Sequence, residues 1–157
     1  MEQNEIFMRE AIKLAEDGMR RGEGGPFGAV VVKDGVVIGR GWNQVTSLND
    51  PTAHAEVMAI RDACKNLKSF QLLDCDIYTS CEPCPMCLGA IYWARPRKIY
   101  FSCTHKDAAE AGFDDSFIYK EINVDPAARK IPASCLLRSD AKLVFDKWVE
   151  KTDKVNY

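Results

Sequence analysis

Residues 29–40 read AVVVKDGVVIGR, in which two runs rich in β-branched residues flank the dipeptide Asp34-Gly35. Valine and isoleucine favour strands, and Asp-Gly is a preferred two-residue turn of a β-hairpin. The runs Ala29–Lys33 and Val36–Arg40 are therefore predicted to pair as antiparallel strands.

Helical patterns flank the hairpin on both sides. Apolar residues recur at helical spacing from Glu5 to Met19, and the Gly-rich stretch 22–25 ends that helix. After a polar loop at 43–50, the sequence Asp50-Pro51-Thr52 is typical of a helix start. A second helix is therefore predicted from His54 to Leu67.

The second half of the chain continues the alternation. It has a strand pattern at 76–80, followed by a helix that begins with the cysteines near Pro83 and Pro85 and runs to Ala94. A second strand pattern follows at 98–103, and an amphipathic closing helix lies around 143–149. Helices that alternate with strands after a hairpin indicate a layered α/β domain with a mixed sheet. The length of 157 residues suits a single domain over residues 1–157.

Composition narrows the functional classes. The net charge of −2 disfavours a large nucleic-acid surface, because such surfaces are usually basic. The first residues, MEQNE, do not resemble a secretory signal, and no apolar run reaches membrane-spanning length, so we expect a cytoplasmic protein without membrane contact. Seven cysteines, an odd number, favour metal ligation over a disulfide framework.

Three candidate metal ligands, His54, Cys84 and Cys87, fall at predicted helix starts. In a first helical turn, residues three apart share one face, where the partial positive charge of the helix end favours thiolates. Zinc accepts imidazole and thiolate ligands, and three protein ligands leave the fourth tetrahedral position for water, as in catalytic sites. We therefore expect Zn²⁺ as the cofactor.

Two other interpretations of the cysteines stay open. Cys81 could be a fourth ligand, which would close the site into a structural one. Alternatively, Cys84 and Cys87 could be small buried residues, since free cysteine is commonly buried.

His105 is interpreted as a surface residue rather than a ligand. The cysteines outside the candidate ligand pair are interpreted as small apolar residues: Cys64, Cys75, Cys81, Cys103 and Cys135.

Glu56 lies two positions after His54, in the predicted first turn. Side chains there lean toward the amino end of the helix, so the imidazole can hold the metal while the longer carboxylate reaches the metal-bound water. Glu56 is then predicted to be the general base and not a ligand. The simpler alternative is an exposed acid stabilised by the helix dipole.

The pair of motifs His54-Ala55-Glu56 and Pro83-Cys84-Pro85-Met86-Cys87 resembles the cytidine deaminase superfamily, whose zinc enzymes act on nucleobases. The strings GPFGA at 25–29, DPTAHAE at 50–56 and TSCEPC at 79–84 are similar to its purine-acting branch. The segment AGFDDSFIY at 111–119 and the final Tyr157 resemble members of that branch that act on guanine.

The resemblance implies a three-layer α/β/α sandwich with a mixed five-stranded sheet. It also implies a homodimer in which the C-terminal segment of one subunit crosses to close the pocket of its partner. Pro126 and Pro132 interrupt the path to the closing helix, as in a connector. The closing helix could instead pack on its own subunit.

The resemblance further implies a purine-binding pocket. Its substrate-contacting residues would be Phe27, Asn43, Ala55, Trp93, Asp115 and Tyr157. Asp115 would also be a second catalytic proton carrier beside Glu56 and the partner of the guanine amino edge. Residue type alone favours core positions for Phe27 and Trp93. It equally allows a turn role for Asn43 and a solvated loop position for Asp115.

The activity implied is hydrolytic deamination of the purine base guanine to xanthine and ammonia, with water as co-substrate. Zinc would lower the pKa of a bound water towards about 7, and Glu56 would shuttle its proton to the ring. Rival substrates are guanosine, cytosine, adenine in transfer RNA and an aminotriazine such as ammeline. A rival of another class is a catalytically inactive, zinc-stabilised binding protein, which the presence of Glu56 disfavours.

Overall fold

The computed structural model describes residues 2–157, which fall into two compact units, residues 2–115 and residues 116–157. The first unit contains the sheet and all three predicted metal ligands. No helix within residues 2–157 is long and apolar enough to cross a membrane. A single functional domain over residues 1–157 stays a prediction.

The first unit is built on a mixed sheet with the strand order β2-β1-β3-β4. The strands are β1 (Gly28–Lys33), β2 (Val36–Trp42), β3 (Cys75–Cys81) and β4 (Lys98–Cys103). β1 pairs antiparallel with β2 and β3, whereas β3 and β4 run parallel. The predicted hairpin is confirmed, and Asp34 and Gly35 at its turn have φ values of 49° and 75°. Positive φ at both positions is what a type I′ turn requires.

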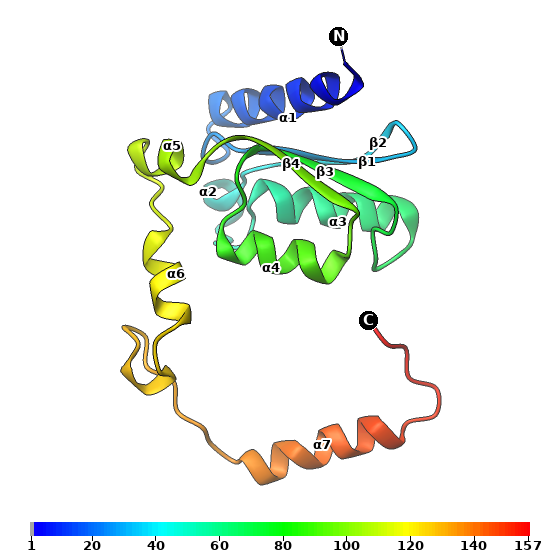
Figure 1. Ribbon diagram of the computed structural model, residues 1–157, viewed down its shortest axis with the longest axis vertical. Helices are drawn as coiled ribbons and strands as arrows, with labels where there is room; N and C mark the ends of the chain where they lie inside the picture. Colours follow the sequence, from blue (N-terminus) through cyan, green and yellow to red (C-terminus); the bar gives the residue numbers. More distant parts are fainter. Residues whose placement is uncertain (1) are drawn as a thin grey trace. The chain divides into compact units, whose positions relative to one another are not determined.

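Helices cover both faces of this sheet (Figure 1). The covering helices are α1 (Gln3–Arg20), α3 (Ala55–Leu67) and α4 (Pro85–Ala94). On the α1 face, Phe7 shares a core cluster with Val30 and Tyr78. On the opposite face, Ala59 and Ile91 of α3 and α4 share a second cluster with Ile77. The predicted three-layer α/β/α sandwich is therefore confirmed.

The unbroken apolar run of β1 follows from its central position in the sheet. Side chains alternate between the two faces of a strand. Val30 and Val32 belong to the cluster under α1, whereas Ala29 and Val31 belong to the cluster under α3 and α4. Because both faces are buried, no position of this run needs a polar residue.

Two glycines of β2 allow α3 to approach the sheet closely. A Cβ atom at Gly39 would lie 2.6 Å from the Ala59 carbonyl oxygen, and one at Gly41 would overlap the Ala55 carbonyl oxygen. Ala55 and Ala59 are themselves fully buried. This close packing fixes the first turn of α3, and with it the position of His54, against the edge strand β2.

The sheet corrects the expected count of strands. The resemblance implied five strands, but the described residues form four. The chain after β4 turns into a helix instead of a further strand, because Thr104 caps α5 (His105–Glu110) through a capping box with Asp107. From there to residue 157 all regular structure is helical.

Helix starts differ slightly from the sequence expectation. The second predicted helix begins one residue late, because His54 is the extended N-cap residue of α3. Asp50 does not cap α3, since its carboxylate accepts hydrogen bonds from the backbone N–H and the hydroxyl of Thr52. The predicted polar loop at 43–50 contains a short helix, α2 (Val45–Leu48).

The second unit is helical and exposes much apolar surface. It contains α6 (Ser116–Ile122), the 3-10 helix η1 (Pro126–Ala128) and α7 (Arg138–Glu150). α7 includes the predicted closing helix, and none of its residues is buried. Its exposed large apolar side chains are Leu143, Val144, Phe145, Trp148 and Val149.

Candidate metal centre and active site

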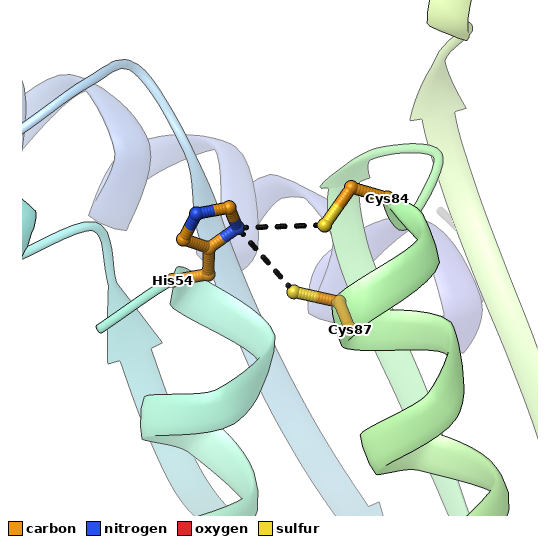
Figure 2. A group of neighbouring side chains, drawn as sticks. All are labelled: His54, Cys84 and Cys87. Carbon is orange, nitrogen blue, oxygen red and sulfur yellow. Dashed lines mark hydrogen bonds between the residues drawn. The ribbon is translucent and has the colours of Figure 1, made fainter. Parts of the chain in front are cut away.

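The starts of two helices meet at the candidate metal centre (Figure 2). His54 is the N-cap of α3, and Cys84 is the N-cap of α4, where Pro85 has a φ suited to the first turn and no amide hydrogen to leave unpaired. Cys87 follows three positions after Cys84, so one helical turn aligns the two sulfurs. His54 Nδ1 lies 3.6 Å from Cys84 Sγ and 3.5 Å from Cys87 Sγ.

The three ligand atoms have the spacing of a zinc site. All of them lie within 4.8 Å of one another. Zinc bonds to imidazole nitrogen at about 2.0 Å and to thiolate sulfur at about 2.3 Å, so two such ligands on a tetrahedral ion stand about 3.5 Å apart. The observed nitrogen–sulfur distances agree with this value, and the residues therefore fit zinc.

The surroundings favour a thiolate at Cys84. The hydrogen bond with Cys87, helped by the one with His54, outweighs burial and lowers the pKa of Cys84 to about 4. The same hydrogen bond, together with burial, raises the pKa of Cys87. Hydrogen bonding with Cys84 also raises the pKa of His54. The lowered pKa of Cys84 favours the charged thiolate form that a metal ion requires.

Glu56 is buried beside this group of ligands. Its side chain belongs to the first turn of α3, and only 6% of the residue is exposed. Burial raises the pKa of Glu56, and hydrogen bonding with Cys87 opposes the shift only in part. The alternative of an exposed first-turn acid is therefore wrong.

Cys81 is not part of the group. Its sulfur lies 3.6 Å from the Thr104 carbonyl oxygen, and burial raises the pKa of the thiol to about 11. The metal-ligand group found among the described residues consists of His54, Cys84 and Cys87 alone. The structure therefore supports a three-ligand site over a closed four-ligand one.

Comparison with known families agrees with these ligands. The family described as cytidine and deoxycytidylate deaminase zinc-binding region matches residues 1–103, which contain all three ligands. The chain belongs to this deaminase family. Zinc is accordingly its cofactor, which agrees with the ligand types and their spacing.

Similarity to individual deaminases extends beyond the family region. Guanine deaminase of Bacillus subtilis (strain 168) is 56% identical to this chain over 154 residues, which is 98% of this chain and 99% of that protein. The X-ray structure of guanine deaminase from Bacillus subtilis matches with a TM-score of 0.95 over 98% of both chains, at 56% identity. The tRNA-specific adenosine deaminase of Buchnera aphidicola subsp. Schizaphis graminum is 34% identical, over 92% of this chain and 93% of that protein.

Two of the predicted substrate residues lie next to the start of α3. The backbone N–H of Asn43 donates to the carbonyl of Phe27 at 3.0 Å. The next residue, Gln44, donates from its backbone N–H to the carbonyl of Ala53, which directly precedes His54. Backbone pairing therefore brings Phe27 and Asn43 to the same end of the sheet as the metal ligands.

The side chains of these two residues are held in place by their neighbours. Asn43 is buried, and its side-chain oxygen accepts hydrogen bonds of 3.2 Å from the backbone N–H groups of Gly25 and Val45. The ring of Phe27 meets Phe113 edge to face, with ring centroids 5.0 Å apart. The amide of Asn43 is thus already oriented, with its NH₂ group as the part that can serve a ligand.

Three of the remaining predicted substrate residues lie in different parts of the structure, one of them buried and two exposed. Ala55 is fully buried at the first position of α3. Trp93 is exposed near the end of α4, nine positions after Cys84, which corresponds to about 13 Å along the helix axis. Tyr157 is exposed and belongs to the second unit. The roles of these three residues stay predictions.

Sequence reasoning missed the surroundings of Asp115. Its carboxylate lies 3.2 Å from the ring of His105, whose other side faces Glu82. His105 thus connects two carboxylates, where the sequence indicated an unassigned surface residue. The capping pattern Thr104-His105-Lys106-Asp107 could have located the helix start, but nothing in the sequence pairs His105 with Glu82.

Proposed function

We propose that this deaminase hydrolyses guanine to xanthine and ammonia. The observation that carries the chemistry is the buried Glu56 carboxyl beside three zinc-ligand atoms of matching spacing. The choice of guanine is supported by the identity with guanine deaminase over nearly the whole chain. A purely structural zinc site has no need of a buried acid at this place, which disfavours an inactive binding protein.

In this proposal, His54, Cys84 and Cys87 hold the zinc ion. When bound, zinc supplies the Lewis acidity that makes water a nucleophile near neutral pH. Glu56 accepts a proton from that water and donates it to the ring nitrogen next to the amino-bearing carbon C2 of guanine. Burial suits Glu56 to both tasks, because a raised pKa lets a carboxyl hold a proton closer to neutrality.

Asp115 is the proposed second proton carrier. The amino group of guanine must leave as ammonia, and a carboxyl next to it can both bind the amino edge and deliver a proton. Water supplies the new oxygen at C2 of xanthine and the amino group leaves as ammonia, so guanine and water give xanthine and ammonia without a further co-substrate. The site would discriminate against a base without this amino group, because such a base would leave the Asp115 carboxylate unpaired.

The other pocket residues would bind the ring. Asn43 would donate from its NH₂ group to the ring edge, since its oxygen already accepts two backbone hydrogen bonds. Phe27 and Trp93 would stack on the purine plane, and Ala55 would contact the base near the zinc. Tyr157 would close the pocket.

We also propose a cytoplasmic homodimer in which the C-terminal segment closes the partner's pocket. The support is the apolar surface of α7, on which Phe145 and Val149 are exposed. A helix with several large apolar side chains exposed is typical of an interaction surface. The cytoplasmic location is supported by seven cysteines that are all free in the structure.

Ammonia release from a panel of bases tests the proposed activity. Zinc-loaded protein is supplied with guanine, guanosine, cytosine, ammeline or a transfer RNA that carries adenine at the editing position. We expect release from guanine at a rate at least about 100-fold above the others. A base with a mismatched polar edge costs several kcal/mol, and the ribose of guanosine would meet the lid formed by Tyr157. The second candidate substrate is adenine in transfer RNA, which the similarity to tRNA-specific adenosine deaminase supports. Faster turnover of the transfer RNA than of guanine would favour this substrate instead. Zinc binding without turnover of any base would indicate a binding protein.

A further inference from the structure

Three side chains outside the metal-ligand group form a chain of polar contacts. His105 Nε2 lies 3.3 Å from Glu82 Oε1, and His105 Nδ1 lies 3.2 Å from Asp115 Oδ2. The side chains are only partly exposed, at 32% for His105, 33% for Glu82 and 18% for Asp115. The imidazole therefore lies between two carboxylates, with one ring nitrogen turned to each.

The Glu82 side of this arrangement is anchored to the backbone. The second oxygen of Glu82 accepts a hydrogen bond of 3.2 Å from the backbone N–H of His105. The backbone N–H of Glu82 donates to the Cys103 carbonyl at 2.8 Å. Thr104 caps the helix that begins with His105. The ring of His105 is thus held from the Nε2 side, which leaves Nδ1 facing Asp115.

The same contacts connect Asp115 to the segment that carries the metal ligands. Glu82 stands two positions before Cys84 in the loop between β3 and α4. The sulfur of Cys81, the residue before Glu82, lies against the Thr104 carbonyl. A continuous series of contacts therefore runs from the loop before α4 through Glu82 and His105 to the carboxylate of Asp115.

We propose that His105 is a positioning residue for the deamination reaction, which holds the Asp115 carboxylate toward the substrate while Glu82 fixes the ring. This inference rests on the proposed role of Asp115 in guanine deamination. His105 acts through Asp115 and does not touch the substrate. A contact of this kind holds a carboxylate in one orientation, and a misplacement of about 1 Å can cost about 100-fold in rate.

Two isosteric substitutions separate this role from a merely structural one. In His105→Asn the side-chain amide can take the place of the Nδ1 atom that faces Asp115 but does not reach Glu82. In His105→Gln the amide can take the place of the Nε2 atom that faces Glu82 but leaves Asp115 without its partner. A positioning role predicts that the asparagine variant keeps activity, whereas a role in anchoring α5 predicts that the glutamine variant does.

The experiment measures kcat and KM for guanine on the full-length, zinc-loaded variants. We expect kcat to fall about 10- to 100-fold in His105→Gln and His105→Ala and only a few-fold in His105→Asn. The control is Lys106→Ala, an exposed change in the same helical turn, which should match the parent protein. Equal kcat in all variants, or loss in His105→Asn with retention in His105→Gln, would overturn the inference.

Two further measurements keep this inference distinct from the proposed function. In Asp115→Ala, the substitution His105→Ala should lower kcat no further, because Asp115→Ala already removes the contact with His105. The ring nitrogen signals of His105, one of only two histidines, can be followed by NMR without any turnover. Asp115→Asn should shift its Nδ1 signal and leave Nε2 nearly unchanged. If the signal shifts but guanine gives no ammonia, the proposed function fails while the contact stands; an unshifted signal overturns the positioning role itself.

Discussion

At the scale of single residues, burial distinguishes Glu56 from other first-turn acids. The dipole of α3 alone would favour its ionised form, but removal from water raises the pKa of this carboxyl. A carboxyl in such a place can exchange a proton with a neighbouring water and a ring nitrogen. Zinc binding depends on ligand atoms of the right type and spacing on other residues. Metal binding and proton transfer are therefore carried out by different side chains.

This division of roles predicts the effect of replacing Glu56. Glu56→Ala and the isosteric Glu56→Gln should both retain close to one zinc per chain and lose at least about 100-fold in kcat for guanine. Metal analysis and ammonia release on the same samples provide the measurement. A variant with full turnover would contradict the assignment of Glu56 as proton carrier, and loss of zinc would make it a ligand.

The cysteines allow a matched pair of substitutions. Cys87→Ser should lose zinc, because a hydroxyl is a much poorer zinc ligand than a thiolate. Cys81→Ser should keep zinc, since the Cys81 sulfur contacts the Thr104 carbonyl and lies outside the ligand group. Zinc content after dialysis against a weak chelator distinguishes the two. Equal loss in both variants would restore Cys81 as a fourth ligand.

At the scale of elements, the site depends on how closely α3 can approach β2. The N-cap of α3 is a metal ligand, so any shift of this helix moves the imidazole. Gly39 and Gly41 leave no room for a side chain against the helix backbone. The small residues of an edge strand thereby determine the geometry of a site to which they contribute no ligand.

A second matched pair tests this packing. Gly41→Ala should lower the free energy of unfolding by about 1–3 kcal/mol and weaken zinc binding, because the new methyl group overlaps the Ala55 carbonyl. Gly89→Ala, inside α4 and with open space around the new atom, should be neutral or stabilising by up to about 1 kcal/mol. Denaturant unfolding and zinc titration measure both effects. Similar stabilities would mean that α3 can move away from β2 without cost.

At the scale of the whole molecule, the two units differ in how they bury apolar residues. Residues 2–115 enclose two core clusters, one on each face of the sheet. In residues 116–157, the apolar side chains of α7 stay exposed. A helix of this kind gains stability chiefly from the surface that it packs against, so the exposed apolar side chains of α7 support the proposed dimer.

The proposed dimer predicts the behaviour of α7 variants. The parent protein should sediment with twice the chain mass of 17.6 kDa, and the double substitution Phe145→Asp and Val149→Asp should shift it to the monomer. Zinc content should not change, because all three ligands lie within residues 2–115. Sedimentation velocity and metal analysis give both results. A monomeric parent protein would rule out the dimer.

Much of the fold was predictable because its patterns are local. The Asp34-Gly35 turn, the alternating faces of β1 and the helix starts at His54 and Cys84 each depend on residues a few positions apart. The capping box of Thr104 is local too, and it explains why the chain turns helical after β4. A fifth strand came only from the resemblance, and nothing in the residues after Cys103 predicted it.

The sequence by itself determined the chemistry of the metal site, because ligand types and their spacing within one helical turn are properties of short segments. Only the tertiary structure decided that Glu56 is buried and that Cys81 is turned away from the ligands. It also brought His105 to Glu82, a residue 23 positions away. The physical reason is that burial and contacts between distant segments follow from how helices pack on a sheet, and no spacing within one segment encodes that packing.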